Sequence, residues 1–311
     1  MRPYLLKLNT ISVFQFKNYA HRTFDFKEPV TAICGKNGSG KTNLLDAIYY
    51  LCFTKSYFSR TDSVNVRYGN NGFRLEGGFD YNGKPEKACC ILRETGKKEF
   101  SVNDMPYEKF SQHIGRYPCV IVTPDDTRMI TDGSEERRRF IDSLLSQLDA
   151  GYLQHLINYN KILVQRNSLL KSFAETGQQN MALLDVLDRQ LAGEGMAVFE
   201  KRKTFLVSFL PEVKQLYNEI SGQYEDISLV YESELMQTSL DTLLSANRQR
   251  DCMAARTGSG IHRDDLDIRF GGQPFKNTAS QGQRKSLLFA LKLAEMDILR
   301  KEKGFAPLLL L

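Results

Sequence analysis

Residues 35–42 read Gly-Lys-Asn-Gly-Ser-Gly-Lys-Thr, which fits the phosphate-binding pattern G-x-x-x-x-G-K-S/T at every fixed position. In such a loop the backbone N–H groups of a glycine-rich turn surround phosphate oxygens, and the helix that follows adds its positive end. We expect Lys41 to reach the β- and γ-phosphates of ATP and the Thr42 hydroxyl to bind Mg²⁺. The predicted nucleotide contacts are Gly35, Lys36, Asn37, Gly38, Ser39, Gly40, Lys41, Thr42 and Asn43.

The residues on either side of this loop indicate a strand before it and a helix after it. Residues 29–34 are mostly apolar and β-branched, which predicts a buried strand. Residues 43–53 have a strong apolar face, which predicts a helix. A strand, a loop and a helix in this order form the context that a phosphate loop requires. The alternative is a chance glycine turn between two such elements.

Composition restricts the class of protein. The chain has 311 residues, of which 41% are hydrophobic and 25% charged, so we expect packed domains and little disorder. No apolar run approaches the roughly 18 residues of a membrane helix, and the first residues lack the apolar core of a signal peptide. The six cysteines form no C-x-x-C pair, which favours buried thiols in a cytoplasmic protein. A net charge of +5 permits a nucleic-acid partner without identifying one.

The order of predicted elements indicates an α/β fold with an antiparallel β subdomain and an inserted helical subdomain. Alternating segments predict an N-terminal hairpin, three further short strands and a continuous apolar core strand, at 6–26, 73–81, 87–93, 99–102 and 119–123. From Ser134 the apolar spacing becomes helical, typical of either an antiparallel helical arm or an ordinary helical subdomain. We expect an ATP-binding domain at 1–130 and 255–311 and an inserted helical domain at 131–254.

A second segment is suited to an anion. Ser280-Gln281-Gly282-Gln283 precedes a strongly apolar helix, and Ser280 is a good N-cap. The N-terminus of a helix with a free hydroxyl and exposed N–H groups attracts phosphate. One triphosphate does not require two such sites on one chain. Two chains could share it, with the phosphate loop of one subunit holding the nucleotide and the Ser280 helix of the other closing on its γ-phosphate.

Segments along the whole chain resemble a known family. They lie at residues 16–19, 35–43, 123–126, 135–142, 165–171, 262–266, 280–284 and 307–311. Together they resemble the RecF family of bacterial DNA replication and repair ATPases, within the ATP-binding-cassette head domains of chromosome-maintenance and recombination ATPases.

The resemblance implies an ATP-dependent homodimer that clasps DNA at gaps and at junctions of single-stranded and duplex DNA. RecR and RecO are the implied partners, and loading of the recombinase RecA in place of single-strand-binding protein is the implied task. ATP and Mg²⁺ are the implied cofactors. Ser280, Gln281, Gly282 and Gln283 would contact the nucleotide held by the partner subunit.

The sequence departs from the family pattern in two places. Cassette ATPases follow a strand such as 307–311 with a Walker B Asp and a catalytic Glu, so we expect those residues beyond Leu311 and leave the catalytic residues unassigned. We expect weak ATPase activity in the intact protein, and weak ATP binding with scarcely any hydrolysis in this chain. Where heads of this type often place a Mg²⁺-contacting Gln, the chain has Asp125 and Asp126, and either could take that part.

Several basic residues are candidates for DNA contact. Arg137, Arg138 and Arg139 form one run, and Lys161, Arg166 and Lys171 fall along one predicted helix. The alternative for the first run is a solvated helix face paired with its neighbouring glutamates. The polar segment 262–265 is either part of the nucleotide or interface region or a turn capped by Asp264.

Three other classes of function use a phosphate loop. An ATP-binding subunit of a membrane transporter does not need so long a helical insert, and capture of a membrane partner would favour it. The ATPase head of a nuclease would need a nuclease domain with metal-binding carboxylates, which the sequence does not display. A small-molecule kinase would leave residues 280–284 unexplained.

Overall fold

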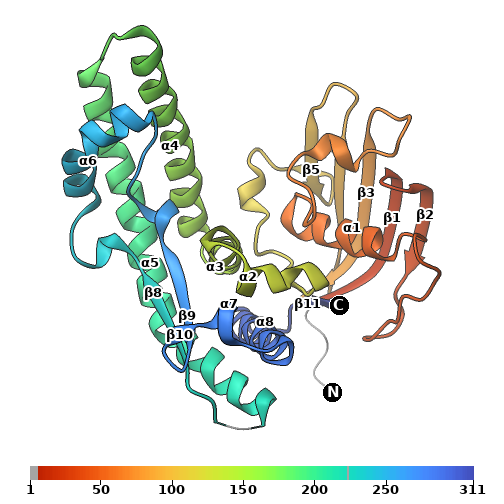
Figure 1. The fold of residues 1–311 in the computed structure, drawn as a ribbon. Coiled ribbons are helices and arrows are strands. Elements are labelled where there is room, and N and C mark those ends of the chain that lie inside the picture. The colour runs from red at the N-terminus through yellow and green to blue at the C-terminus, as the bar shows by residue number, and fades with distance from the viewer. Residues whose placement is uncertain (1–5, 223) are drawn as a thin grey trace. The chain divides into compact units, whose positions relative to one another are not determined.

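The computed structural model describes residues 6–222 and 224–311, and contacts group the chain into two compact units (Figure 1). The first, which we call the loop unit, extends to Thr123 and includes Met296–Leu311. The second, the helical unit, comprises Pro124–Glu295. Residues 255–295, which the sequence analysis assigned to the ATP-binding domain, are therefore grouped by their contacts with the helices.

An antiparallel sheet forms most of the loop unit. Its strands lie in the order β2-β1-β3-β4-β5-β6. Their bounds are β1 Leu6–Phe16, β2 Tyr19–Asp25, β3 Phe73–Tyr81, β4 Lys84–Leu92, β5 Lys98–Val102 and β6 Met105–Pro106. Helix α1 (Lys41–Phe53) packs on this sheet, and nine of its residues are buried. The predicted hairpin, the three further strands and the helix after the loop are confirmed.

A second, smaller sheet pairs β7 (Cys119–Ile121) in parallel with β11 (Leu308–Leu310). The predicted core strand at 119–123 is thus confirmed in part. The predicted strand at 29–34 is wrong, because these residues pair with no strand of the described chain. Val30 is 89% exposed, whereas a buried strand needs a neighbour on its hydrogen-bonding edge and cover on its faces.

The helical unit is built on two long helices that lie side by side as an antiparallel pair (Figure 1). They are α4 (Ala150–Thr176) and α5 (Met181–Ser221). Asp149 and Asn180 cap their N-termini by accepting hydrogen bonds from backbone N–H groups, and Gly177 ends α4 in the left-handed conformation with φ 71°. Residues 177–180 therefore connect the two helices.

The remaining elements of the helical unit are short by comparison. Its helices are α2 Arg128–Thr131, α3 Ser134–Leu148, α6 Leu240–Ala254 and α7 Phe275–Thr278, and α8 Gln281–Lys303 begins in this unit. Its sheet has the order β10-β9-β8, with β8 Ile227–Glu232, β9 Asp265–Phe270 and β10 Gln273–Pro274. Five single 3₁₀ turns complete the described chain: η1 Asp62–Asn65, η2 Phe110–Gln112, η3 Pro124–Thr127, η4 Glu234–Met236 and η5 Ile261–Arg263. Over the described residues, every helix is too short or too polar to cross a bilayer.

A buried arginine joins α4 to the segment that follows α6. The Arg166 side chain is 0% exposed, and its guanidinium donates to Asp188 at 2.6 Å, to Asp251 at 2.7 Å and to the Thr257 hydroxyl at 2.8 Å. Two carboxylates thus compensate one buried cation, and each comes from a different helix. The contact fixes α4 against α5 and α6.

A second buried arginine, on α5, makes an equivalent set of contacts nearer the sheet. Arg202 donates to Asp142 at 2.7 Å, to Asp264 at 2.9 Å and to the Ile261 carbonyl at 3.0 Å. The Tyr231 hydroxyl also donates to Asp264, at 2.5 Å. Arg202 therefore ties α3, α5, η5 and β8 together and holds residues 261–264 in the helical unit.

We expect Arg166→Met to destabilise the helical unit by about 3–5 kcal/mol, because it leaves the buried carboxylate of Asp251 without a counter-charge and that of Asp188 with Arg248 alone. Urea unfolding followed by circular dichroism measures the loss. Arg189→Met is the matched control, since Arg189 is exposed on α5 and donates only to a carbonyl of its own helix. Equal stability of the two variants would contradict the structural role of Arg166.

The loop unit contains a fully buried histidine. His113 bonds through Nε2 to the Leu51 carbonyl at 2.8 Å and faces the Tyr107 hydroxyl through Nδ1 at 3.3 Å. Burial is the main cause that lowers its pKa to about 4. The neutral ring therefore donates from Nε2 and accepts at Nδ1.

This histidine predicts acid sensitivity. The unfolded chain binds the proton more tightly, so His113 stabilises the fold above about pH 6.5 and loses that contribution as the pH falls toward about 4. The loss should reach about 3 kcal/mol. His113→Gln keeps a donor for Leu51 but cannot titrate. We expect its free energy of unfolding to vary less between pH 7 and pH 4 than that of the unsubstituted chain, and an equal pH slope would contradict this.

Candidate nucleotide site and signature segment

The phosphate loop reaches α1 through a glycine that nothing larger could replace. Gly40 has φ 103°, a conformation that side chains disfavour, and it immediately precedes the first helical residue, Lys41. A Cβ atom on Gly40 would lie 2.7 Å from the Asn18 amide and 2.8 Å from the Tyr19 hydroxyl. The loop backbone thus lies directly against the turn between β1 and β2.

That turn holds the loop by hydrogen bonds. The Tyr19 hydroxyl donates to the Gly40 carbonyl at 3.0 Å, and the Asn43 amide donates to the Asn18 side chain at 2.8 Å. Asn18 and Tyr19 therefore support the loop from outside the phosphate-binding motif. From sequence alone, residues 16–19 contribute only to the family resemblance, because the hairpin register that places them beside the loop is a tertiary feature.

An ion pair fixes the same turn to the helix. Lys17 Nζ lies 2.5 Å from the buried carboxylate of Asp46 on α1. Asp46 also accepts from the Ser56 hydroxyl at 2.7 Å and from the Tyr57 backbone N–H at 2.8 Å. A buried carboxylate with three donors is well compensated, so the turn, the helix and the segment after the helix form one rigid support.

The groups that would bind phosphate lie in the loop and in the first turn of α1. Lys41 Nζ donates to the carbonyls of Gly35 at 2.8 Å and Lys36 at 3.0 Å, so its ammonium lies across the loop. The backbone N–H groups of Gly38, Gly40, Lys41 and Thr42 donate to no atom of the described chain. Free donors at the positive end of a helix form an anion site, and the Thr42 hydroxyl is in the first turn where a Mg²⁺ ligand is needed.

The signature segment begins α8 with reciprocal capping. The Ser280 hydroxyl accepts from the Gln283 backbone N–H at 3.2 Å, and the Gln283 side chain accepts from the Ser280 N–H at 2.8 Å. The Gln283 amide also donates to Glu225 at 3.1 Å. Gln281 and Gly282 are exposed. The predicted N-cap is therefore confirmed, and the start of α8 faces solvent with its backbone fixed.

The two aspartates after β7 have different surroundings. Asp125 is exposed, whereas Asp126 is buried with its carboxylate 3.9 Å from Lys292 Nζ. Lys292 also lies 3.4 Å from Glu295, whose pKa is raised by burial. In the parts of the chain that the structure describes, no three His, Cys, Asp or Glu residues gather as a metal site.

In the first run of predicted DNA contacts, all three arginines bind other residues of the chain. Arg137 donates to both carboxylate oxygens of Asp265, at 2.7 and 3.0 Å, and Arg138 donates to the Asp264 carbonyl at 2.6 Å. Burial and the nearby Arg202 lower the pKa of Arg138. Arg139 is exposed and pairs with glutamates of its own helix.

The second run of predicted DNA contacts, on α4, contains two exposed residues and one buried residue. Lys161 and Lys171 are exposed on α4 and remain predicted DNA contacts. Arg166 is wrong as a DNA contact, because its buried guanidinium is held by Asp188 and Asp251. At the polar segment 262–265, the Asp264 carboxylate binds Arg202 and Tyr231, so it serves the packing of the helical unit. Periodicity placed Arg166 on a helix but could not show which face was covered.

The chain is similar to known proteins in both sequence and structure. A family described as an AAA domain matches residues 10–251. The chain is 44% identical to the DNA replication and repair protein RecF of Flavobacterium johnsoniae over 98% of this chain and 85% of that protein. Two solved structures of the recombination mediator protein RecF in the RecFOR pathway are also similar. The one with ATP has a TM-score of 0.92 at 30% identity, covering 100% of this chain and 86% of the other. The one with ATPrS has a TM-score of 0.91 at 29% identity, covering 98% and 85%.

We expect Lys41→Ala to weaken ATP binding at least tenfold, because it removes charge-assisted contacts worth about 1.5–3 kcal/mol each. Isothermal titration calorimetry measures the affinity. Lys84→Ala, at an exposed lysine that begins β4, is the control for the loss of one positive charge. Unchanged affinity in Lys41→Ala would contradict the assignment of the loop.

Proposed function

Since the chain belongs to the RecF family of DNA replication and repair proteins, we propose that it is an ATP-dependent DNA clamp that acts at gaps and junctions. ATP binds at the phosphate loop, two chains then associate across the nucleotides, and the dimer holds DNA. The fold is that of an ATP-binding-cassette type P-loop ATPase, as in the RecF structures it resembles. The cytoplasm is the compartment in which such a protein meets its DNA.

The observation that carries the proposal is the supported phosphate loop. Four backbone N–H groups of the loop and of the first turn of α1 have no acceptor within the described residues, and the Lys41 ammonium lies across the same loop. The contacts of Asn18, Tyr19 and Asn43 hold this geometry in place before a ligand arrives. Preorganised donors bind phosphate without a further ordering cost. Mg²⁺, held by Thr42 and by phosphate oxygens, would neutralise charge on the triphosphate.

The signature segment supports association of two chains. Ser280 and Gln283 cap each other, so the first N–H groups of a 23-residue helix are fixed toward solvent. The phosphate loop belongs to the loop unit, whereas Ser280 belongs to the helical unit. In the proposed dimer each nucleotide lies between the loop of one chain and Ser280 of the other. Such a two-fold arrangement closes with two identical sites. Weak hydrolysis would then release the partner.

DNA is the proposed ligand of the closed dimer. Arg139, Lys161 and Lys171 are the exposed candidates for phosphate contact. RecFOR membership of the similar structures makes RecR and RecO the proposed protein partners. The assembly would help a recombinase to replace single-strand-binding protein.

We expect Ser280→Arg to leave ATP binding to the monomer nearly unchanged and to prevent ATP-driven dimerisation. A bulky cation would replace a small capping hydroxyl where the γ-phosphate of the partner must dock. Analytical ultracentrifugation with ATP and Mg²⁺ measures the change from monomer to dimer.

The control is Ser245→Arg, the same replacement at an exposed position of α6. It should dimerise as the unsubstituted chain does. If Ser280→Arg still forms dimers with ATP, Ser280 is only a helix cap and the shared nucleotide must be given up. Loss of ATP binding in Ser280→Arg would also contradict the separation of the two segments.

A further inference from the structure

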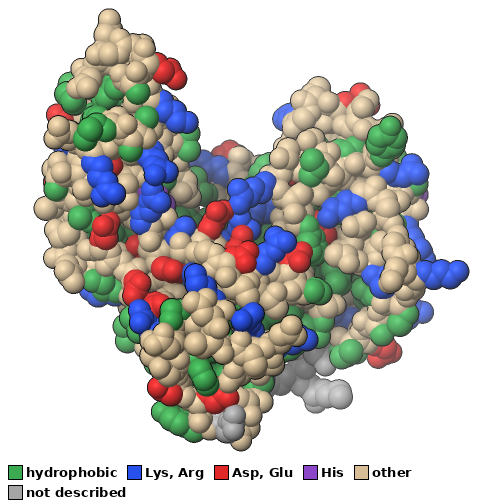
Figure 2. Space-filling model, viewed as in Figure 1, with side chains coloured by type: hydrophobic (Ala, Val, Ile, Leu, Met, Phe, Trp, Pro, Cys, Tyr) green, Lys and Arg blue, Asp and Glu red, His purple; other side chains and the backbone are tan. Residues whose placement is uncertain are grey.

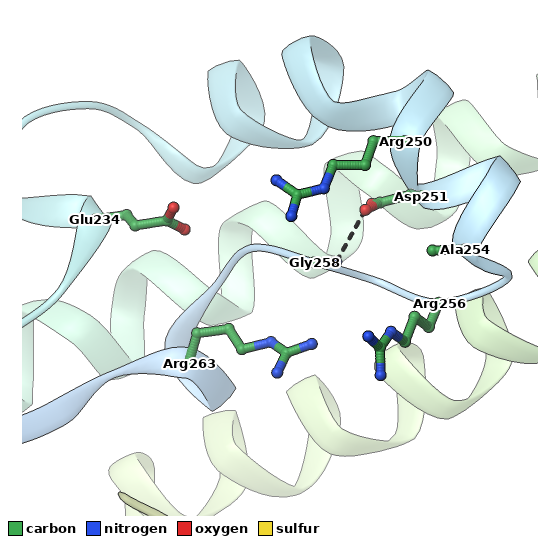
Figure 3. Close-up of a pocket in the computed structure, with 7 residues that line it drawn as sticks. All are labelled: Glu234, Arg250, Asp251, Ala254, Arg256, Gly258 and Arg263. Carbon is green, nitrogen blue, oxygen red and sulfur yellow. Dashed lines mark hydrogen bonds between the residues drawn. The ribbon is translucent and has the colours of Figure 1, made fainter.

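A pocket in the helical unit lies between the end of α6 and the segment that follows it (Figure 3). Its volume is about 470 Å³, which is in the range of sites for small ligands. Its lining consists of Glu234, Arg250, Asp251, Ala254, Arg256, Gly258 and Arg263. Three of these seven residues are arginines, and their guanidinium groups approach the open middle of the pocket from different sides (Figure 3).

These three arginines are not compensated within the described chain. Arg250, Arg256 and Arg263 are exposed, and none of their guanidinium groups forms an ion pair or hydrogen bond with another described residue. Asp251 cannot balance them, because its carboxylate accepts from the buried Arg166 and from the Gly258 backbone N–H. Glu234 is the one other acid in the lining. Three cations therefore face one available carboxylate.

The backbone that carries the arginines is fixed. Ala255 turns the chain after α6 in the left-handed conformation, with φ 51°. The N–H and hydroxyl of Thr257 both donate to Asn167 at 2.8 Å, and the Arg263 N–H donates to the Gly260 carbonyl at 2.8 Å. Gly258 is held by Asp251 at 2.9 Å. Like charges are thus brought together by a rigid segment and cannot avoid one another by moving the backbone.

An anion with several oxygens would satisfy this arrangement. Guanidinium groups match phosphate because they offer paired N–H donors in a plane, and three of them can bind different oxygens of one group. The face drawn in Figure 2 also shows Lys and Arg side chains gathered over α6 and the segment after it. Such a surface raises the local concentration of phosphate-bearing ligands.

We propose that Arg250, Arg256 and Arg263 form a phosphate-binding pocket on the helical unit, separate from the phosphate loop. The ligand is a phosphate group, carried either by a polynucleotide backbone or by a free phosphate compound. The pocket does not depend on ATP at the loop, so failure of the proposed ATP switch would leave it untouched.

The test uses pyrophosphate and duplex DNA as probes, on the full chain with Lys41→Ala in every variant to weaken binding at the phosphate loop equally. Replacement of all three arginines by Gln should weaken pyrophosphate binding at least tenfold in calorimetry. Arg189→Gln, an exposed arginine on α5 outside the pocket, should change it less than twofold. Because the three side chains have no partners in the described chain, the thermal midpoint should stay the same.

A change in the opposite direction guards against a folding artefact. Glu234→Gln removes the uncompensated acid of the lining and should strengthen pyrophosphate binding about threefold. If DNA is the source of the phosphate, the triple variant should also reduce the slope of log affinity against log salt by at least about 0.9. An unchanged slope with lost pyrophosphate binding would assign the pocket to free phosphate compounds. Pyrophosphate binding equal to that of Arg189→Gln would overturn the proposal.

Discussion

The helical unit depends on two buried arginines, whose guanidinium groups each pair with aspartates. Arg166 and Arg202 are the largest fully buried side chains of the described residues, and a charge in that position is tolerated only with counter-charges and hydrogen bonds. Each lies between two aspartates that come from separate elements. The long helices and the segment before β9 are therefore positioned by charge compensation in addition to apolar packing.

The loop unit is organised by a different constraint, which is the close approach of two backbones. Gly40 allows the phosphate loop to lie against the β1–β2 turn, and the bonds of Asn18 and Tyr19 then keep it there. Lys17 and Asp46 extend the support to the helix. The donors for phosphate are consequently oriented by groups that touch no phosphate themselves. A substitution in the turn would act on nucleotide binding through the position of the loop.

Local patterns in the sequence predicted these elements well, and tertiary contacts explain the failures. The phosphate loop, the first hairpin, the long helices and the Ser280 cap depend on residues close in sequence, so spacing and turn chemistry were enough. The segment 29–34 looked like a strand because it is apolar, but a strand also needs an edge to pair with. Arg166 looked like a surface cation because charge is usually exposed, and its partners Asp188 and Asp251 are 22 and 85 residues away.

The arginines of the helical unit fall into two groups, those paired with aspartates and those without a partner among the described residues. Buried arginines there are matched with aspartates, and Arg137 reaches Asp265 in the same way. Arg250, Arg256 and Arg263 are exposed and have no such partner in the described chain. Arg250 lies on α6 beside Asp251, and Arg256 and Arg263 lie in the segment that Asp251 and Asn167 hold after this helix. Asp251 is committed to Arg166, so the contact that stabilises the unit also removes the nearest counter-charge from the pocket. The Arg166–Asp251 pair thus contributes to the stability of the helical unit and also leaves the pocket with an excess of positive charge. An external anion would compensate that charge.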